Sequence, residues 1–118
     1  ILDCAHNADG ARALAIALRV FKYKRLVFVM GIMADKDIRG IFRELLPMAD
    51  TVIFVEPENK RRADAKVLAK MAKPYQCRIV EIKDVRRAID YAVEEAGPLG
   101  LVCVTGSVFT VAEAMRWE

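Results

Sequence analysis

The sequence predicts an α/β fold, namely a three-layer, Rossmann-like open sheet in which five mainly parallel strands alternate with five helices. Short runs rich in Val, Ile and Phe recur along the chain, and several are apolar at consecutive positions. That pattern is typical of strands buried on both faces of a parallel sheet. Between these runs, apolar residues recur at helical spacing, which places a helix after each strand.

The predicted strands follow one another at intervals long enough for a helix between each pair. They are Ile1–Cys4, Leu26–Met30, Thr51–Val55, Arg78–Ile82 and Leu101–Thr105. In the first four helices the apolar face consists of Ala11, Leu14, Ala15, Leu18 and Phe21, then Ile38, Ile41, Phe42, Leu45 and Leu46, then Val67, Leu68, Met71 and Ala72, then Val85, Ala88, Ile89, Ala92, Val93 and Ala96. The last helix is expected over Val108 to Trp117.

Local signals support the helix ends. Asp37 and Asp84 stand where N-capping side chains are preferred, just before apolar periodic segments. Pro47, Pro74 and the pair Gly97-Pro98 are expected to end their helices, because neither residue type continues a helix well.

Composition narrows the class of protein. The 118 residues, of which 55% are hydrophobic and 30% charged, fit one globular domain over residues 1–118. The net charge of +3 is too small to indicate nucleic-acid binding, and no apolar run approaches the roughly 18 residues of a membrane span. Cys4, Cys77 and Cys103 form no CxxC pair, which argues against a metal site or disulfide and favours a reduced, cytoplasmic protein. We expect Cys77 and Cys103 to be buried in strands.

In open α/β sheets, ligands bind beyond the carboxyl ends of the strands, so polar residues that directly follow strands are candidates. The first strand ends in Asp3, His6 and Asn7, which place a carboxylate, an imidazole and an amide at the start of a helix. A carboxylate can bind ribose hydroxyls, and a His can meet phosphate or polarise a carbonyl. The alternative is structural: Asn7 or Asp9 caps the helix, and His6 is an ordinary turn residue.

The later strands also lead into polar segments. The second leads into Gly31–Asp37, where Lys36 lies between carboxylates and can meet phosphate; the alternative is a capped helix start with a solvated charge cluster. The third leads into Glu56–Ala63, with three consecutive cations that suit an anionic ligand or form a solvated face. The fifth ends in Thr105–Ser107, where Ser107 either binds a carboxylate or caps the last helix.

Several catalytic motifs are missing. There is no G-x-S-x-G elbow, which argues against a serine hydrolase. GxGxxG and GxxxxGK[ST] are also absent, so the chain has no recognised phosphate-binding loop of its own for ATP.

The order of three segments resembles the C-terminal domain of the Mur ligase superfamily, and within it folylpolyglutamate synthase and dihydrofolate synthase. The segments are Leu2–Asn7, Gly31–Asp37 and Thr105–Ser107, against a family pattern of D-G-A-H-N-P, G-x-x-x-D-K-D and T-G-S. Cys4 stands in place of the usual Gly and Ala8 in place of the usual Pro. The stretch Asn59–Ala63 is similar to a family Asn-Pro-Arg-Ala segment, with Lys60 at the Pro position and Arg61 at the Arg position.

This resemblance implies an ATP-dependent ligase that adds glutamate to a folate through an acyl phosphate. ATP and Mg²⁺ would be needed by the full enzyme, with the phosphate-binding loop and most Mg²⁺ ligands in an N-terminal ATPase domain absent from this chain. By position, Asp3 would hold the ATP ribose, and His6, supported by Asn7, would lie near the acyl phosphate or the glutamate. Lys36 would face phosphate or the glutamate.

The resemblance also implies a contact between Ser107 and the glutamate carboxylate, and substrate-binding positions for Asp35 and Arg61. It places the fifth strand beside the first, so that Ser107 and His6 share one site. The expected partners are glutamate, a folate-type substrate and the ATPase domain, with no nucleic acid and no membrane. The isolated chain would be inactive.

Two other functions stay open at the level of sequence. One is a related Mur-type peptide ligase with another acceptor, such as a cell-wall precursor, because acceptor choice lies largely in the missing domain. The other is a stand-alone ligand-binding module. The opening of the chain within a strand, without Met, suggests a fragment or a processed product.

Overall fold

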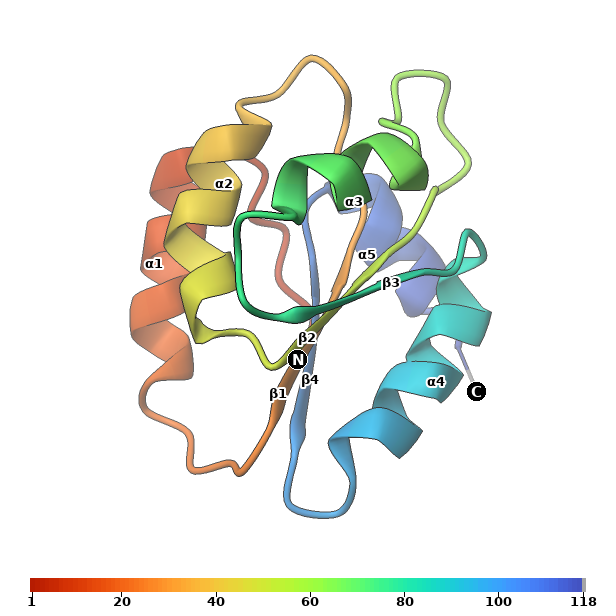
Figure 1. Cartoon of the computed structure of the whole chain (residues 1–118). Helices are drawn as coiled ribbons and strands as arrows, with labels where there is room; N and C mark the ends of the chain where they lie inside the picture. The colour runs from red at the N-terminus through yellow and green to blue at the C-terminus, as the bar shows by residue number, and fades with distance from the viewer. Residues whose placement is uncertain (118) are drawn as a thin grey trace.

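The computed structural model describes residues 1–117 and contains a parallel four-stranded sheet between two layers of helices (Figure 1). The strands, in the spatial order β3-β2-β1-β4, are β1 (Leu26–Met30), β2 (Thr51–Phe54), β3 (Arg78–Glu81) and β4 (Leu101–Thr105). The helices are α1 (Ala8–Leu18), α2 (Ile38–Leu45), α3 (Ala65–Ala72), α4 (Val85–Ala96) and α5 (Val108–Ala114), with a short 3₁₀ turn, η1 (Leu46–Met48). The predicted three-layer architecture is confirmed.

The two faces of the sheet each have an apolar core. Helices α1, α2 and α3 pack on one face, against Leu26, Phe28 and Met30 of β1 and their neighbours. Helix α4 and the end of α5 pack on the other face, against Val27 and Val29. All five residues of β1 and all four of β2 are buried, which explains why these runs are apolar at every position and not at alternate ones.

The first predicted strand is shorter than expected, so the sheet has four strands and not five. Leu2 makes an isolated parallel bridge to Val104, supported by the hydrogen bond that the Asp3 amide donates to the Val104 carbonyl. A single bridge is too short to count as a strand, yet it fixes the segment beside β4. The expected neighbourhood of the first and last strands is therefore confirmed.

Helix ends agree with the capping signals. The side chains of Asp37 and Asp84 cap α2 and α4 by accepting hydrogen bonds from the Gly40 and Arg87 amides. The chain leaves α4 through Gly97, whose φ of 71° lies in the left-handed region that glycine tolerates best. Boundaries are less well predicted, because α1 ends at Leu18 and leaves Phe21 of the predicted face 51% exposed.

Other expected features need small corrections. The last helix ends at Ala114 and not at Trp117, and Val67 and Val93 of the predicted apolar faces are about half exposed. Cys103 is fully buried in β4, as expected, but Cys77 is only partly buried because it precedes β3, at the rim of the sheet. Among the described residues, no helix is long and apolar enough to cross a membrane.

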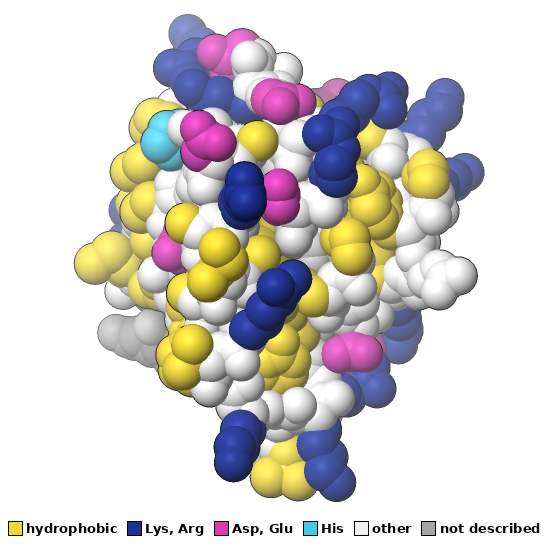
Figure 2. All heavy atoms as spheres, turned by 90° about the vertical axis from the view of Figure 1, so that its left-hand side faces the viewer, with side chains coloured by type: hydrophobic (Ala, Val, Ile, Leu, Met, Phe, Trp, Pro, Cys, Tyr) yellow, Lys and Arg dark blue, Asp and Glu magenta, His cyan; other side chains and the backbone are white. Residues whose placement is uncertain are grey.

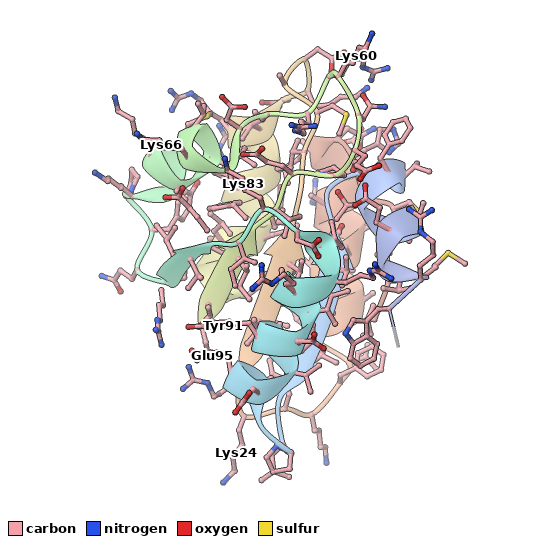
Figure 3. The ribbon with its side chains drawn as sticks, turned by 90° about the vertical axis from the view of Figure 1, so that its right-hand side faces the viewer. Lys24, Lys60, Lys66, Lys83, Tyr91 and Glu95 are labelled. Atoms are coloured by element: carbon pink, nitrogen blue, oxygen red, sulfur yellow. The ribbon has the colours of Figure 1, made fainter. Side chains whose placement is uncertain are left out.

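Glu95 joins three strands at their amino ends. Its carboxylate accepts a hydrogen bond from the Thr51 hydroxyl at 3.1 Å and forms salt bridges with Arg25 at 3.1 Å and Arg78 at 3.4 Å (Figure 3 labels Glu95 on α4). The Glu95 side chain is 16% exposed, whereas the two Arg side chains are 48% and 60% exposed. Since exposed ion pairs contribute little, the bond to the fully buried Thr51 is the most important of these contacts.

We expect Glu95→Ala to lower the free energy of unfolding by about 1–3 kcal/mol, because the buried Thr51 hydroxyl loses its acceptor. Urea denaturation measures this loss. The matched control is Glu94→Ala, an exposed position on the same helix, which should change stability by less than about 0.5 kcal/mol. We call Glu95, Thr51, Arg25 and Arg78 the Glu95 cluster. Equal effects of the two substitutions would show that this cluster contributes nothing to stability.

The thiols should differ in reactivity with pH. Burial raises the pKa of the Cys103 thiol to about 12 and also raises that of Cys77. Because labelling requires both a thiolate and access for the reagent, the exposed Cys4 should be labelled at a pH of about 9, whereas Cys103 should stay unlabelled in the folded chain. Mass spectrometry after a short pulse of iodoacetamide measures this, and labelling in urea serves as the control. Fast labelling of Cys103 in the native chain would contradict its burial.

Candidate functional site

Strand order places a crevice between β1 and β4. From β1 the chain proceeds to β2 and β3 on one side, whereas β4 lies on the other side. The loops that leave β1 and β4 therefore diverge at their carboxyl ends, which is where open α/β sheets bind ligands. A pocket of about 140 Å³ lies here, and we call it the switch-point pocket. It is lined by His6, Met33, Lys36, Arg61, Ser107, Val108 and Phe109.

Two glycines let the loops of β1 and β4 meet at the base of this crevice. Gly106 has a φ of 110°, and a Cβ there would lie 2.5 Å from the Gly31 carbonyl oxygen. A Cβ on Gly31 would lie 2.6 Å from Oγ1 of Thr110. Both distances are shorter than real Cβ contacts allow, so neither position accepts a side chain without movement of its neighbours.

A relay of hydroxyl groups fixes the turn into α5. Thr110 Oγ1 donates to the Gly31 carbonyl at 2.9 Å, which uses its single proton. The 2.7 Å contact between the hydroxyls of Ser107 and Thr110 therefore has Ser107 as donor. The Ser107 oxygen in turn accepts from the Thr110 amide at 3.0 Å. Ser107 is 2% exposed, so in this state its hydroxyl caps α5 and the turn closes the wall of the pocket.

His6 lies between the switch-point pocket and a second, more open pocket. The second pocket has a volume of about 520 Å³ and runs along α1; we call it the α1 groove. It is lined by Asp3, Cys4, Ala5, His6, Asn7, Gly10, Ala13, Leu14 and Ala17. Because His6 lines both pockets, a group bound to its ring is within reach of ligands on either side. Figure 2 shows the histidine, in cyan, near a rim where Lys, Arg, Asp and Glu side chains gather.

One nitrogen of the His6 ring is held by a hydrogen bond to the backbone. Its Nδ1 lies 3.1 Å from the Cys4 carbonyl oxygen. A carbonyl oxygen only accepts, so Nδ1 carries a proton and the neutral ring has its lone pair on Nε2. This exposed imidazole can accept a proton at Nε2 or, once protonated, donate to an anion.

Asp3 and Asn7 lie in the α1 groove and not in the switch-point pocket. One Asp3 carboxylate oxygen accepts from the Ala5 amide at 2.9 Å, which leaves the other oxygen available for a ligand hydroxyl. Asn7 is the N-cap of α1, with its Oδ1 accepting from the Gly10 amide at 2.7 Å. Its capping role, expected as the alternative, is confirmed, and its contribution is to hold the turn that contains His6.

A short antiparallel pairing positions the basic segment after β2. Met33 and Arg62 form an isolated bridge, the Ala34 amide donates to the Arg61 carbonyl, and the Ala63 amide donates to the Ile32 carbonyl. This pairing brings the loop after β2 against the loop after β1 and so places Arg61 at the pocket. It joins residues about 30 positions apart in sequence, and no local pattern predicts it.

The cations around the pocket differ in how strongly they are held. Arg61 forms only an exposed 3.7 Å salt bridge to Asp35, which is worth little and leaves the guanidinium available to a ligand. Asp35 itself does not line the pocket and acts through Arg61. Arg62 is bound to Glu56 at 3.4 Å, and Glu56 also accepts from the Ala65 amide. Lys36 is half-buried and has no salt bridge within 4.0 Å among residues 1–117.

One residue of this region, Thr110, was not anticipated from the sequence. Thr110 makes the relay to Gly31, a contact between residues 79 positions apart that no local sequence signal predicts. Thr105 is fully buried at the end of β4, and its Oγ1 has no hydrogen-bond partner among the described residues. Within residues 1–117, no group of three His, Cys, Asp or Glu side chains is placed to hold a metal ion.

Known proteins that are similar to this chain in sequence or in structure include several folylpolyglutamate synthases. A protein of Halobacterium salinarum named "Probable bifunctional folylpolyglutamate synthase/dihydropteroate synthase" is 40% identical over 119 residues, which cover 99% of this chain. The Mycobacterium tuberculosis folylpolyglutamate synthase structure complexed with ADP and AMPPCP superposes with a TM-score of 0.85 at 34% identity over 95% of the chain. The Yersinia pestis bifunctional folylpolyglutamate synthase/dihydrofolate synthase complexed with AMPPNP and Mn ion gives 0.86 at 32% identity over 97%.

The match extends over nearly the whole of this chain but over a small part of each relative. The chain spans 14% of the Halobacterium protein, 28% of the Mycobacterium chain and 27% of the Yersinia chain. Residues 1–108 match the family model described as Mur ligase, glutamate ligase domain. The chain therefore belongs to the Mur ligase family, of which it contains the glutamate ligase domain.

Proposed function

We propose that this chain is the amino-acid-binding domain of an ATP-dependent ligase that adds glutamate to a folate. The observation that carries the proposal is the meeting of His6, Lys36, Arg61 and Ser107 in one pocket at the switch point of the sheet. These residues come from four separate loops, and three of them belong to the motifs shared with the family. The similarity to folylpolyglutamate synthases supports glutamate as the amino acid and a folate as the acceptor.

The two pockets on either side of His6 suggest a division of roles. The switch-point pocket holds the glutamate, with its carboxylates facing the free cations Lys36 and Arg61. The α1 groove faces the nucleotide, and the free oxygen of Asp3 accepts from the ribose hydroxyls. Ser107 acts as a positioning residue, because its hydroxyl is already used within the turn.

In the proposed reaction, the acceptor carboxylate is phosphorylated from ATP, the glutamate amino group attacks the acyl phosphate, an amide bond forms and phosphate leaves. The amino group must lose a proton before it can attack. Nε2 of neutral His6 can accept that proton, since Nδ1 is held by the Cys4 carbonyl. The folded chain thus supplies a base and cations, and these alone do not activate the acceptor.

In this proposal, the groups that bind the phosphates of ATP and the Mg²⁺ ion belong to a preceding ATPase domain. Neither a phosphate-binding loop sequence nor a three-ligand metal cluster occurs within residues 1–117, so the β- and γ-phosphates of ATP and the Mg²⁺ ion are held by that domain. Because the reaction consumes ATP, we propose that it takes place in the cytoplasm.

The isolated 118-residue chain should not add glutamate to any folate, because it contains no recognised phosphate-binding loop for ATP. The measurement is product formation from radiolabelled glutamate, ATP and tetrahydrofolate, with the protein that contains the ATPase domain as positive control. Turnover by the isolated chain would contradict the division of the site between two domains.

In the protein that contains both domains, His6→Ala should lower kcat by about 10²-fold or more, since proton transfer by a placed side chain contributes of that order. The measurement is steady-state glutamate addition with saturating ATP. Arg19→Ala, an exposed position at the end of α1, is the matched control and should leave kcat unchanged.

Thermal unfolding of both variants separates a catalytic effect from a loss of fold. A His6→Ala variant with normal kcat would remove His6 from the reaction. If product forms only when a cell-wall peptide precursor replaces the folate, the proposed ligase activity would stand but its acceptor would be the peptide precursor.

A further inference from the structure

Strand β3 forms an open edge of the sheet, away from the switch-point pocket. In Figure 3, β3 lies at the rim of the sheet below α3, with no element beyond it. The amides of Arg78 and Ile82 donate to β2, to the carbonyls of Asp50 and Phe54. Backbone groups alternate in direction along a parallel strand, so the N–H and C=O groups of Ile79 and Glu81 point outward.

A row of cations stands above this edge. Lys66, Lys70 and Lys73 occupy one face of α3, at the helical spacing i, i+4 and i+7, and none makes a salt bridge within 4.0 Å among the described residues. Together with Ala69, Ile79 and Glu81 they line a groove of about 380 Å³. The groove therefore combines unpaired backbone groups, a small apolar floor and three cations against one carboxylate.

We propose that the β3 edge binds an extended acidic protein segment, which adds to the sheet as a further strand. This surface is independent of the ligase site. Binding by strand addition takes its affinity from backbone hydrogen bonds and its specificity from alternate side chains. Side chains on one face of an added strand recur about every 6.6 Å. Lys66 and Lys70 are separated by about 6 Å along the helix axis and Lys70 and Lys73 by about 4.5 Å, so carboxylates at alternate positions match the first pair more closely than the second.

Other occupants fit the groove less well. Lysines beside an edge strand prevent pairing between two copies of the same chain, since lysine rows would then face each other. The same charges favour a strand of opposite sign. Nucleic acid would use the lysines, but the groove lining contains no aromatic side chain on which bases stack, and a phosphate backbone makes no use of the outward amides.

The probe is a fluorescein-labelled heptapeptide, Val-Glu-Val-Glu-Val-Glu-Val, titrated with the 118-residue chain and followed by fluorescence anisotropy and by amide shifts in NMR spectra. We expect saturable binding that weakens with salt, with shifts at Ile79 and Glu81. The peptide with Lys in place of each Glu should bind at least about 10-fold more weakly, because its charges repel the lysine row.

Substitutions in the chain test each part of the surface. Lys66→Gln, Lys70→Gln and Lys73→Gln together should lower affinity at least about 10-fold. The charge-matched control combines Arg19→Gln, Lys22→Gln and Lys24→Gln at exposed positions near the end of α1, and it should leave affinity within about 2-fold.

Two substitutions at Glu81 separate the contribution of the backbone hydrogen bond to affinity from that of the charge. Glu81→Gln keeps the outward N–H and removes the opposing carboxylate, so affinity should rise. Glu81→Pro removes that N–H without removing a bond to β2, which an edge strand tolerates, so affinity should fall below that of Glu81→Gln. Circular dichroism checks that each variant is folded. If Glu81→Pro unfolds, the amide shifts of Ile79 and Glu81 in the unsubstituted chain decide whether the peptide binds along β3.

Three results would each overturn the proposal: no saturable binding of the acidic heptapeptide, equal binding of its Lys counterpart, or binding without amide shifts along β3. Binding of a single-stranded oligonucleotide of equal charge, with the same affinity and no shifts at Ile79 and Glu81, would assign the lysines to nucleic acid instead.

Discussion

The close approach of Gly31 and Gly106 is the constraint on which the candidate site depends. These residues directly follow β1 and β4, the two strands between which the order of the sheet reverses. Their lack of side chains lets Thr110 reach the Gly31 carbonyl, and that bond fixes the proton of Ser107 within the turn into α5. A larger residue at either position would separate the two loops. The pocket wall, the start of α5 and the position of the histidine turn, which is bonded to Gly106 through the Ala5 carbonyl, would all change together.

The hydrogen bonds at the crevice leave few polar groups free to contact a ligand. The residues at the crevice hold one another in place: Asn7 caps α1, Ser107 caps α5, and Asp35 is paired with Arg61. The groups left free are one nitrogen of His6, one oxygen of Asp3, Lys36, and the weakly held Arg61. A base and cations can bind and deprotonate an amino acid, but they do not generate an activated carboxyl group. These free groups fit the amino-acid-binding role proposed above, in which a separate domain carries the phosphate chemistry.

Sequence alone predicted those features whose signals are local. Apolar runs gave the buried strands, Asp37 and Asp84 marked two helix starts, and the order of three motifs pointed to one family. The residues that it did not place depend on contacts distant in sequence: Met33 pairs with Arg62, and Thr51 meets Glu95. A capping signal and a substrate-binding signal also look alike in sequence, since a Ser before a helix serves either purpose. Only the hydrogen-bond pattern around Ser107 separates them, because it shows where the hydroxyl proton goes.

The functional surfaces lie in separate parts of the fold, which bears on how substitutions should be interpreted. The Glu95 cluster joins the amino ends of the strands, the switch-point pocket lies at their carboxyl ends, and the lysine groove lies along the outer edge of β3. None of these surfaces shares a residue with another, but Arg78 of the Glu95 cluster adjoins Ile79 of the lysine groove on β3, so nearly additive effects are expected only between the switch-point pocket and the other two surfaces. Lys36 is different, because it lines both the switch-point pocket and a neighbouring pocket of about 550 Å³ beside α2 and α3. A change at Lys36 therefore alters two surfaces at once, as does a change at His6, which lines the switch-point pocket and the α1 groove, whereas Glu95 and Lys70 each report on one region of the molecule.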